Sequence, residues 1–258
     1  MYYVCFGNGE KKLAVLPGLS DGLATVKGKA LLLSPPYRRF RDYTVYIFSR
    51  KNSMPEGYSI RDMAADQVKA MDILGIERAS VLGVSQGGMI AQYIASDHPE
   101  KVEKLILAVT APYMNDTVKG AVSGWEAMAR QGDHLSLMKD TAEKTYTHAY
   151  LEKNRKLLRL AAKFTKPRDY DRFLKNARAI LSFEDRIDFG RITAPTLIIA
   201  GDDDNTVGND APYELHERIS GSEMYIYRGL GHGLFDEAGD FYDRIYDFVS
   251  GNGIHSLA

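Results

Sequence analysis

Short runs of apolar residues alternate with helical patterns along most of this chain. Between two of these runs, apolar residues at helical spacing predict a helix over Ser59–Leu74, and Ser59 with Asp62 resembles a capping box at its start. A second helix is predicted over Gly239–Val249. The alternation favours an α/β fold, a mostly parallel central sheet with helices on both faces. The predicted strands are Tyr2–Phe6, Lys12–Leu16, Tyr43–Ser49, Ala79–Val84, Glu103–Val109, Thr196–Ala200 and Glu223–Arg228.

Residues 113–190 follow a different pattern. They contain no convincing strand, and helical segments dominate, broken at Gly132 and Pro167. The simplest interpretation is a helical insertion between two strands of one sheet. We therefore expect a core of residues 1–112 and 191–258, with residues 113–190 forming a helical cap. The basic stretch Lys153–Arg178 is interpreted as a solvated helix face in preference to an anion-binding surface.

Composition narrows the class of protein. The 258 residues are 45% apolar, enough for one large domain with an insertion, and the net charge of −1 gives no indication of nucleic acid or an anionic membrane as partner. No apolar run approaches the ~18 residues that span a bilayer, and the amino-terminal residues lack a secretory pattern. Cys5, interpreted as a buried strand residue, is the only cysteine. These features predict a cytoplasmic protein, and the sequence gives no oligomeric state.

The segment Gly83–Gly87 has the pattern G-x-S-x-G between a predicted strand and an apolar helical run. Such a junction lifts the hydroxyl of Ser85 above the sheet edge in a strained backbone conformation, and the flanking glycines make room for the turn. Alone the pattern is weak, because glycine and serine also form ordinary turns. It gains weight only if a histidine and an acid follow.

An acid and a histidine do follow, each after a later strand. Nucleophilic serine needs an imidazole to take its proton and a carboxylate to orient the imidazole. In open α/β sheets such groups gather at the carboxyl ends of strands. Three aspartates at positions 202–204 follow one predicted strand, and His232, between two glycines, follows the next. The chain order is serine, acid, histidine.

Together these motifs resemble the α/β-hydrolase fold superfamily over nearly the whole chain. They read GVSQGGMIAQYIA, HPEKVEKLIL, PTLIIAGDDDNTV and GLGHGLFDE. The resemblance implies a catalytic triad of Ser85, Asp204 and His232. Asp202 and Asp203 stay possible as the acid because three consecutive aspartates leave the register open; Asp203 is the next choice, and Asp116 is a minor alternative. The remaining histidines are interpreted as structural: His98, His134, His148, His216 and His255.

The resemblance also implies two backbone N–H donors for an oxyanion. One is Gln86, directly after the nucleophile, and the other is Leu19, in the loop after an early strand. Pro17 stands where the family most often has histidine, which we interpret as reshaping the loop without removing the donor. A second departure lies at Arg50 and Lys51, where many members have an Asp-x-x-Gly turn. A surface turn is favoured there over contact with a substrate carboxylate.

Serine at the elbow excludes relatives that use aspartate or cysteine there, such as haloalkane dehalogenases and dienelactone hydrolases. The motifs look most like the small carboxylesterase and enol-lactonase branch. The resemblance thus implies a serine hydrolase of a small-molecule ester or lactone, with no metal or other cofactor. Trp125, Met128 and Tyr146 are candidates to line the substrate pocket, although cap core is the favoured interpretation. An acyltransferase, a thioesterase and a weakly catalytic ligand receptor stay open as alternatives.

Overall fold

The computed structural model describes residues 1–252, without the side chain of Ala161. Its sheet has seven strands in the order β1-β3-β2-β4-β5-β6-β7, with β1 antiparallel to β3 and all other pairs parallel. The predicted strands are confirmed within one residue at each end. They are β1 (Tyr3–Phe6), β2 (Lys11–Leu16), β3 (Tyr43–Phe48), β4 (Ala79–Val84), β5 (Val102–Ala108), β6 (Thr196–Gly201) and β7 (Glu223–Tyr227).

Both predicted helices of the sheet-forming part are confirmed as α2 and α10. Ser59 caps α2 with the predicted capping box, since its side chain accepts from the N–H of Asp62 and the Asp62 carboxylate accepts from the N–H of Ser59. The α-helices are α1 (Ala30–Leu33), α2 (Ile60–Ile73), α3 (Gln86–Asp97), α4 (Asp116–Arg130), α5 (His134–Thr145), α6 (His148–Phe164), α7 (Asp171–Leu181), α8 (Ala211–Arg218), α9 (Leu234–Glu237) and α10 (Phe241–Ser250). The 3-10 helices are η1 (Leu19–Gly22), η2 (Pro35–Tyr37), η3 (Pro99–Lys101) and η4 (Phe189–Arg191).

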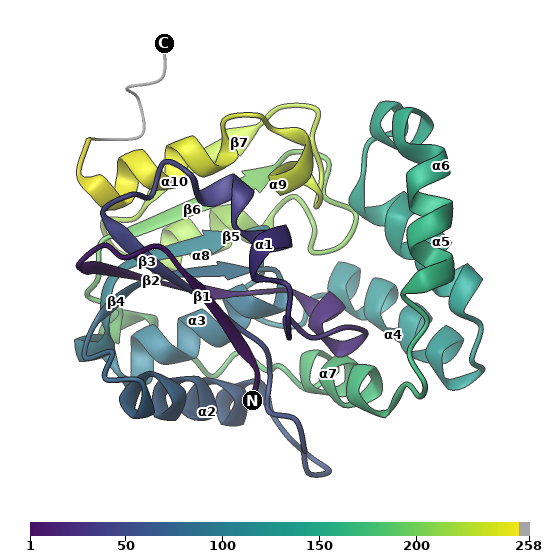
Figure 1. The fold of residues 1–258 in the computed structure, drawn as a ribbon, viewed down its shortest axis with the longest axis horizontal. Helices are drawn as coiled ribbons and strands as arrows, with labels where there is room; N and C mark the ends of the chain where they lie inside the picture. Colours follow the sequence, from purple (N-terminus) through teal and green to yellow (C-terminus); the bar gives the residue numbers. More distant parts are fainter. Residues whose placement is uncertain (253–258) are drawn as a thin grey trace.

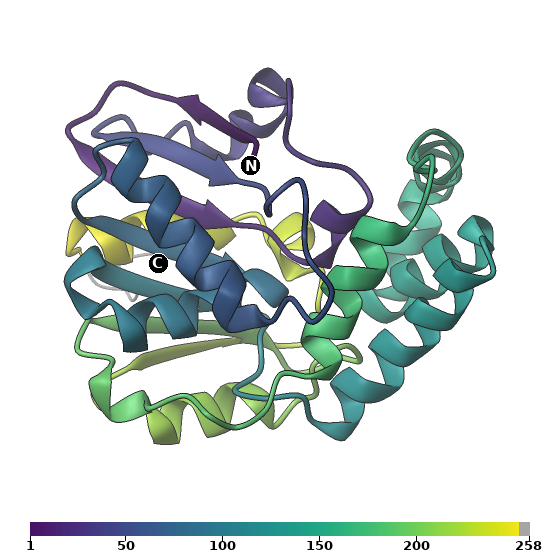
Figure 2. The same cartoon turned by 90° about the horizontal axis from the view of Figure 1, so that it is seen from below.

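The sheet is covered on both faces, as predicted. Helices α2, α3 and α8 pack on one face through apolar residues such as Met63, Ile90 and Leu215. Helices α9 and α10 cover the other, where Leu234 and Ile245 share a second apolar cluster. Figures 1 and 2 show these two layers on either side of the strands. The central strands β4 and β5 are almost fully buried, which fixes the ends from which the site residues emerge.

Helices α4 to α7 lie between β5 and β6 in the chain and form a separate layer beyond one end of the sheet (Figures 1 and 2). The carboxyl ends of the parallel strands point toward this layer (Figure 1). The predicted breaks at Gly132 and Pro167 fall between helices, and a further break at Tyr146 and Thr147 separates α5 from α6. The layer therefore stands over the edge at which α/β folds bind their ligands.

One prediction about the first strand is wrong. Cys5 lies on β1 as expected, but its side chain is exposed. Along this edge strand the side chains alternate, so Val4 points into the core and Cys5 points to solvent. Among residues 1–252, no helix has the length and apolar character needed to cross a membrane.

Candidate active site

The G-x-S-x-G segment forms a sharp turn from β4 into α3. Ser85 has φ +55° and ψ −120°, a backbone conformation that residues other than glycine rarely adopt. A Cβ on Gly83 would lie 2.5 Å from the carbonyl oxygen of Gly87, and a Cβ on Gly87 would lie 1.8 Å from that of Leu16. Since these neighbours are backbone atoms, only glycine fits at either position, which explains the spacing of the motif.

Residues at the end of β5 hold this strained turn in place. The N–H of Ser85 donates to the carbonyl of Ala108 at 2.9 Å, and the Thr110 hydroxyl donates to the carbonyl of Ser85 at 2.8 Å. Between them, Val109 has φ +45°, which is unusual for a β-branched residue. Such a conformation typically costs about 1–3 kcal/mol. Sequence reasoning missed both Val109 and Thr110, because no local pattern marks a residue that supports a turn elsewhere in the chain.

Three of the predicted site residues meet at the carboxyl ends of β4, β6 and β7. The Ser85 Oγ lies 2.9 Å from Nε2 of His232, and Nδ1 of His232 lies 2.9 Å from Oδ2 of Asp204. His232 and Asp204 are 6% and 3% exposed. The other carboxylate oxygen of Asp204 accepts from the N–H groups of Thr206 and Val207 at 2.8 and 2.9 Å. The acid is thus fully hydrogen bonded and fixed in orientation.

This order of contacts fits one distribution of protons. When Nδ1–H of His232 donates to the Asp204 carboxylate, Nε2 is left as an acceptor for the hydroxyl of Ser85. The buried carboxylate also stabilises the imidazolium that forms once the serine proton is taken. The arrangement can therefore generate a serine nucleophile. That these residues are catalytic stays a prediction.

The alternative acids lie elsewhere. Asp203 is exposed and its carboxylate is next to the Asn205 amide, while Asp202 accepts from the N–H of Gly229 at 2.6 Å. Asp116 is exposed at the start of α4. The structure thus brings Asp204 to His232 and gives its two neighbours other roles in the turn.

The other histidines occupy the predicted helical positions. His98 caps the end of α3, His134 and His148 begin α5 and α6, and His216 is in the last turn of α8. His255 lies outside the described residues. No group of three or more His, Cys, Asp and Glu suited to holding a metal ion is found within residues 1–252.

The two predicted oxyanion donors each begin a helix. Gln86 is the first residue of α3, and Leu19 is the first residue of η1. The loop before η1 runs against the elbow, because a Cβ on Gly18 would lie 3.2 Å from the Cβ of Ser85. Within residues 1–252, neither the backbone N–H of Leu19 nor the backbone N–H of Gln86 donates to an acceptor. Both N–H groups are free for a ligand, although their role stays a prediction.

The favoured interpretation of Arg50 as part of a surface turn is wrong. Its side chain is fully buried, and Nη2 donates to the carbonyl of Pro17 and to Oε1 of Gln86, the latter at 3.2 Å. Lys51 does face solvent and pairs with Asp66 at 3.3 Å. A polar Ser-Arg-Lys-Asn segment is typical of a turn, and nothing local shows that one of its cations turns inward.

The three candidate pocket residues occupy different environments. Tyr146, between α5 and α6, hydrogen bonds to Asp236 at 2.7 Å, and its ring packs against Gly233, next to His232. Trp125 is buried on α4, and its indole N–H donates to Asp140 of α5 at 2.8 Å. Met128 packs against the apolar cluster that contains Trp125. Tyr146 therefore adjoins the site, whereas the polar edge of Trp125 faces the helical layer itself.

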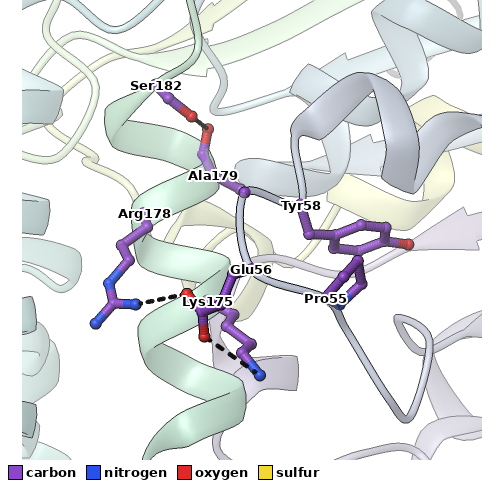
Figure 3. Close-up of a pocket in the computed structure, with 8 residues that line it drawn as sticks. Pro55, Glu56, Tyr58, Lys175, Arg178, Ala179 and Ser182 are labelled. Carbon is purple, nitrogen blue, oxygen red and sulfur yellow. Dashed lines mark hydrogen bonds and ion pairs between the residues drawn. The ribbon is translucent and has the colours of Figure 1, made fainter.

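The cavity drawn in Figure 3 lies away from these groups. It has a volume of about 220 Å³ and separates residues 55–58 from α7. Glu56 spans it, pairing with Lys175 at 3.7 Å and with Arg178 at 3.2 Å. Ser85, Asp204 and His232 are not among its lining residues. The cavity therefore lies at the junction between α7 and the sheet-forming part.

Comparisons with known proteins agree with this fold. A family model described as alpha/beta hydrolase fold matches residues 41–239. A protein assigned provisionally as the carbamate hydrolase RutD, from Caulobacter sp. strain K31, is 28% identical over 224 residues, which cover 77% of this chain and 75% of that protein. The 2-hydroxy-6-oxononadienedioate/2-hydroxy-6-oxononatrienedioate hydrolase of Klebsiella pneumoniae is 27% identical, with coverage of 79% and 73%.

Solved structures with the same fold include two hydrolases. The enol-lactonase from Burkholderia xenovorans LB400 has a TM-score of 0.81 and 22% identity, with 96% of each chain covered. The esterase EaEST from Exiguobacterium antarcticum has a TM-score of 0.76 and 23% identity, covering 96% of this chain and 95% of that one. At these identities the structures establish a shared fold, and the chemistry has to be inferred from the site.

Proposed function

The chain belongs to the alpha/beta hydrolase fold family, and we propose that it is a serine hydrolase that cleaves a small carboxylic ester or lactone through an acyl-enzyme on Ser85. The observation that carries the proposal is the hydrogen-bonded series Ser85–His232–Asp204, with both links at 2.9 Å. It joins residues from three strand ends in the order that nucleophilic serine catalysis needs.

The first half-reaction forms the acyl-enzyme. His232 takes the proton of Ser85 as its Oγ attacks the acyl carbon, and the Asp204 carboxylate stabilises the resulting imidazolium. The N–H groups of Leu19 and Gln86 hold the developing oxyanion, and the start of α3 adds the positive end of a helix dipole. His232 then passes its proton to the leaving alkoxide. The alcohol of an ester departs, whereas the hydroxyl of an opened lactone stays attached to the acyl group on Ser85.

The second half-reaction reverses these roles with water as the nucleophile. His232 takes a proton from water, which attacks the acyl carbon, and then returns that proton to Oγ of Ser85 as the acid is released. No proton or electron is left over, and the chemistry asks for no cofactor. Two relatives are named as hydrolases of a carbamate and of a dienedioate, and two similar structures are an enol-lactonase and an esterase. Their names support a small acyl substrate.

We also propose that residues 113–190 act as the cap of this site, over a core of residues 1–112 and 191–258. Support comes from the position of α4 to α7 beyond the strand ends (Figure 2). Further support comes from Tyr146, which adjoins the His232 loop. A cap of this kind excludes water and sets substrate size. The single cysteine, which allows no intrachain disulfide, supports the cytoplasm as the proposed location.

A panel of p-nitrophenyl esters of graded acyl length, with several lactones and an aryl carbamate, tests the proposal. Wild type should turn over at least one short ester many times per active site, and Ser85→Ala should reduce that rate to background. An acyltransferase or thioesterase would instead prefer an added alcohol acceptor or a thioester. A receptor would release only about one product per protein. Ester turnover that survives in Ser85→Ala would refute the role of Ser85.

A further inference from the structure

Arg50 is a buried cation that contacts both segments with a proposed oxyanion donor, the Pro17–Leu19 segment and the start of α3. Desolvation lowers the pKa of its guanidinium to about 10, opposed by the nearby Asp21 carboxylate, so the group keeps its charge at neutral pH. Within residues 1–252, Nε and Nη1 are buried without a hydrogen-bond partner. Enclosing a charge in this way costs several kcal/mol and is weak evidence for a stabilising role. The position of Arg50 therefore calls for a different explanation.

The two acceptors of Arg50 belong to opposite halves of the proposed oxyanion hole. Nη2 donates to the carbonyl of Pro17, two residues before Leu19, and to Oε1 of Gln86, which supplies the other donor through its backbone. One nitrogen atom thus contacts both donor segments at once. Pro17 belongs to the loop that carries Leu19, so a side chain from the segment after β3 supports that loop.

Neighbouring residues fix Arg50 and Gln86 in turn. The N–H of Arg50 donates to Oδ2 of Asp21 at 2.9 Å, and Nη2 of Arg172 on α7 donates to the same oxygen at 2.6 Å. The amide of the Gln86 side chain donates to the carbonyl of Asn176 at 3.0 Å. Figure 3 shows two further contacts of α7, in which Lys175 and Arg178 pair with Glu56. The network therefore runs from α7 through η1 to the elbow.

We propose that Arg50 is a positioning residue that holds the Leu19 and Gln86 amides at a fixed separation, and so sets the geometry of the oxyanion hole. The proposal rests on the proposed function, since an oxyanion forms only if Ser85 attacks a carbonyl. Donors must be held within about 0.5 Å of the productive geometry, and a misplacement of about 1 Å can reduce a rate on the order of 100-fold. Arg50 acts through these amides and does not touch the substrate.

Lysine and glutamine at this position separate geometry from charge. Arg50→Lys keeps the positive charge but replaces the planar fork with a single, strongly hydrated ammonium group. Arg50→Gln keeps hydrogen-bonding capacity and removes the charge. If geometry is what matters, both variants should lose activity to a similar extent. The matched control is Arg244→Lys, a buried arginine on α10 that pairs with Asp240.

The experiment measures kcat and KM on a p-nitrophenyl ester and the inhibition constant of an arylboronic acid, at a temperature well below every variant's Tm. The boronic acid forms a tetrahedral adduct with serine and places a hydroxyl where the oxyanion would lie. Both Arg50 variants should lower kcat by about 10- to 100-fold, leave KM within about twofold, and weaken the boronic acid by a similar factor to kcat. Arg244→Lys should keep all three values within about twofold of wild type.

A second route avoids any folding defect of the Arg50 variants. Gln86→Met removes one of the two acceptors of Arg50, Oε1 of Gln86, while leaving the backbone N–H of residue 86 in place. It should lower kcat and boronic acid affinity together, and combining it with Arg50→Lys should add little, because both changes break the same link. Wild-type kcat and inhibition in Arg50→Lys, or additive losses in the double variant, would overturn the proposal. If wild type turned over no ester, or if turnover survived in Ser85→Ala, the proposed function would instead be refuted.

Discussion

The nucleophile elbow and the helical layer α4–α7 are attached to the site in opposite ways. The elbow is set by close backbone contacts, since a Cβ on Gly87 would lie 1.8 Å from the carbonyl oxygen of Leu16. The helical layer is attached through side chains far apart in sequence. Arg172 pairs with Asp21, 151 positions away, and Tyr146 bonds to Asp236, 90 positions away. The elbow therefore tolerates no change in shape, whereas the layer is held by several contacts that can be removed one at a time.

This contrast predicts all-or-none effects for changes at the elbow and graded effects for changes in the helical layer. The elbow, with Asp204 and His232, can only be intact or broken, because each group has one productive position. The helical layer contacts the surroundings of the site in two places. One is α7 against η1, and the other is the end of α5, where the N–H of Gly233 donates to the carbonyl of Thr145 at 2.6 Å. Substitutions there should change the rate and stability by degrees.

The strongest test of the contrast is a methyl group placed at the elbow. Gly87→Ala puts a Cβ 1.8 Å from the Leu16 carbonyl, so the backbone must move and the variant should lose ester turnover together with several kcal/mol of stability. Gly120→Ala, in α4 where a Cβ meets open space, should instead gain up to about 1 kcal/mol from better helix propensity. Urea denaturation and steady-state kinetics measure both, and equal behaviour of the two variants would break the contrast.

Next in size is the exchange of the acid. Asp204→Asn should lower kcat by about 10³–10⁴-fold at nearly unchanged structure, since an amide no longer holds the His232 tautomer that accepts the serine proton. Asp203→Asn, one residue away and exposed, should stay within about twofold of wild type. Ester kinetics on the two variants decide the assignment, and a larger loss in Asp203→Asn would reverse it.

A smaller, graded effect is expected where α7 meets the oxyanion loop. Arg172→Gln removes the ion-pair partner of the buried Asp21 carboxylate and leaves it the N–H of Arg50 as donor, which should cost about 2–4 kcal/mol in thermal or urea unfolding and lower kcat several-fold. The control is Glu56→Gln, which breaks only the exposed pairs of Figure 3 and should cost no more than about 1 kcal/mol. A loss in Glu56→Gln as large as that in Arg172→Gln would show that α7 is not anchored at Asp21.

The smallest expected effect is a pH response within the layer. Desolvation, with Lys166 nearby, lowers the pKa of His134, opposed by a backbone hydrogen bond to Ala162. His134 also begins α5, where a helix dipole disfavours added positive charge. The unfolded chain then takes up the proton first, so this contribution to stability is lost as pH falls below about 6.5. The Tm of wild type should fall more between pH 7 and pH 5 than that of His134→Gln, and parallel curves would exclude the effect.

The parts of the site that could be predicted are those that a short run of adjacent residues determines. Strand ends, the elbow, and the order of serine, acid and histidine all follow from runs of adjacent residues, and the sheet formed as expected. Asp204 could be separated from Asp203 only in three dimensions, by which carboxylate reaches His232. Arg50 and Thr110 were missed because their partners, Pro17 and Ser85, are contacted only after the strands have paired.

The most direct test of the central claim is covalent labelling of Ser85. Intact-mass spectrometry after treatment with a fluorophosphonate should find one adduct per wild-type chain, with peptide mapping to the segment that contains Ser85. His232→Gln should react far more slowly, because the imidazole no longer takes the serine proton. Ser85→Ala should gain no adduct at all. Equal labelling of wild type and Ser85→Ala would contradict the assignment of Ser85 as the nucleophile.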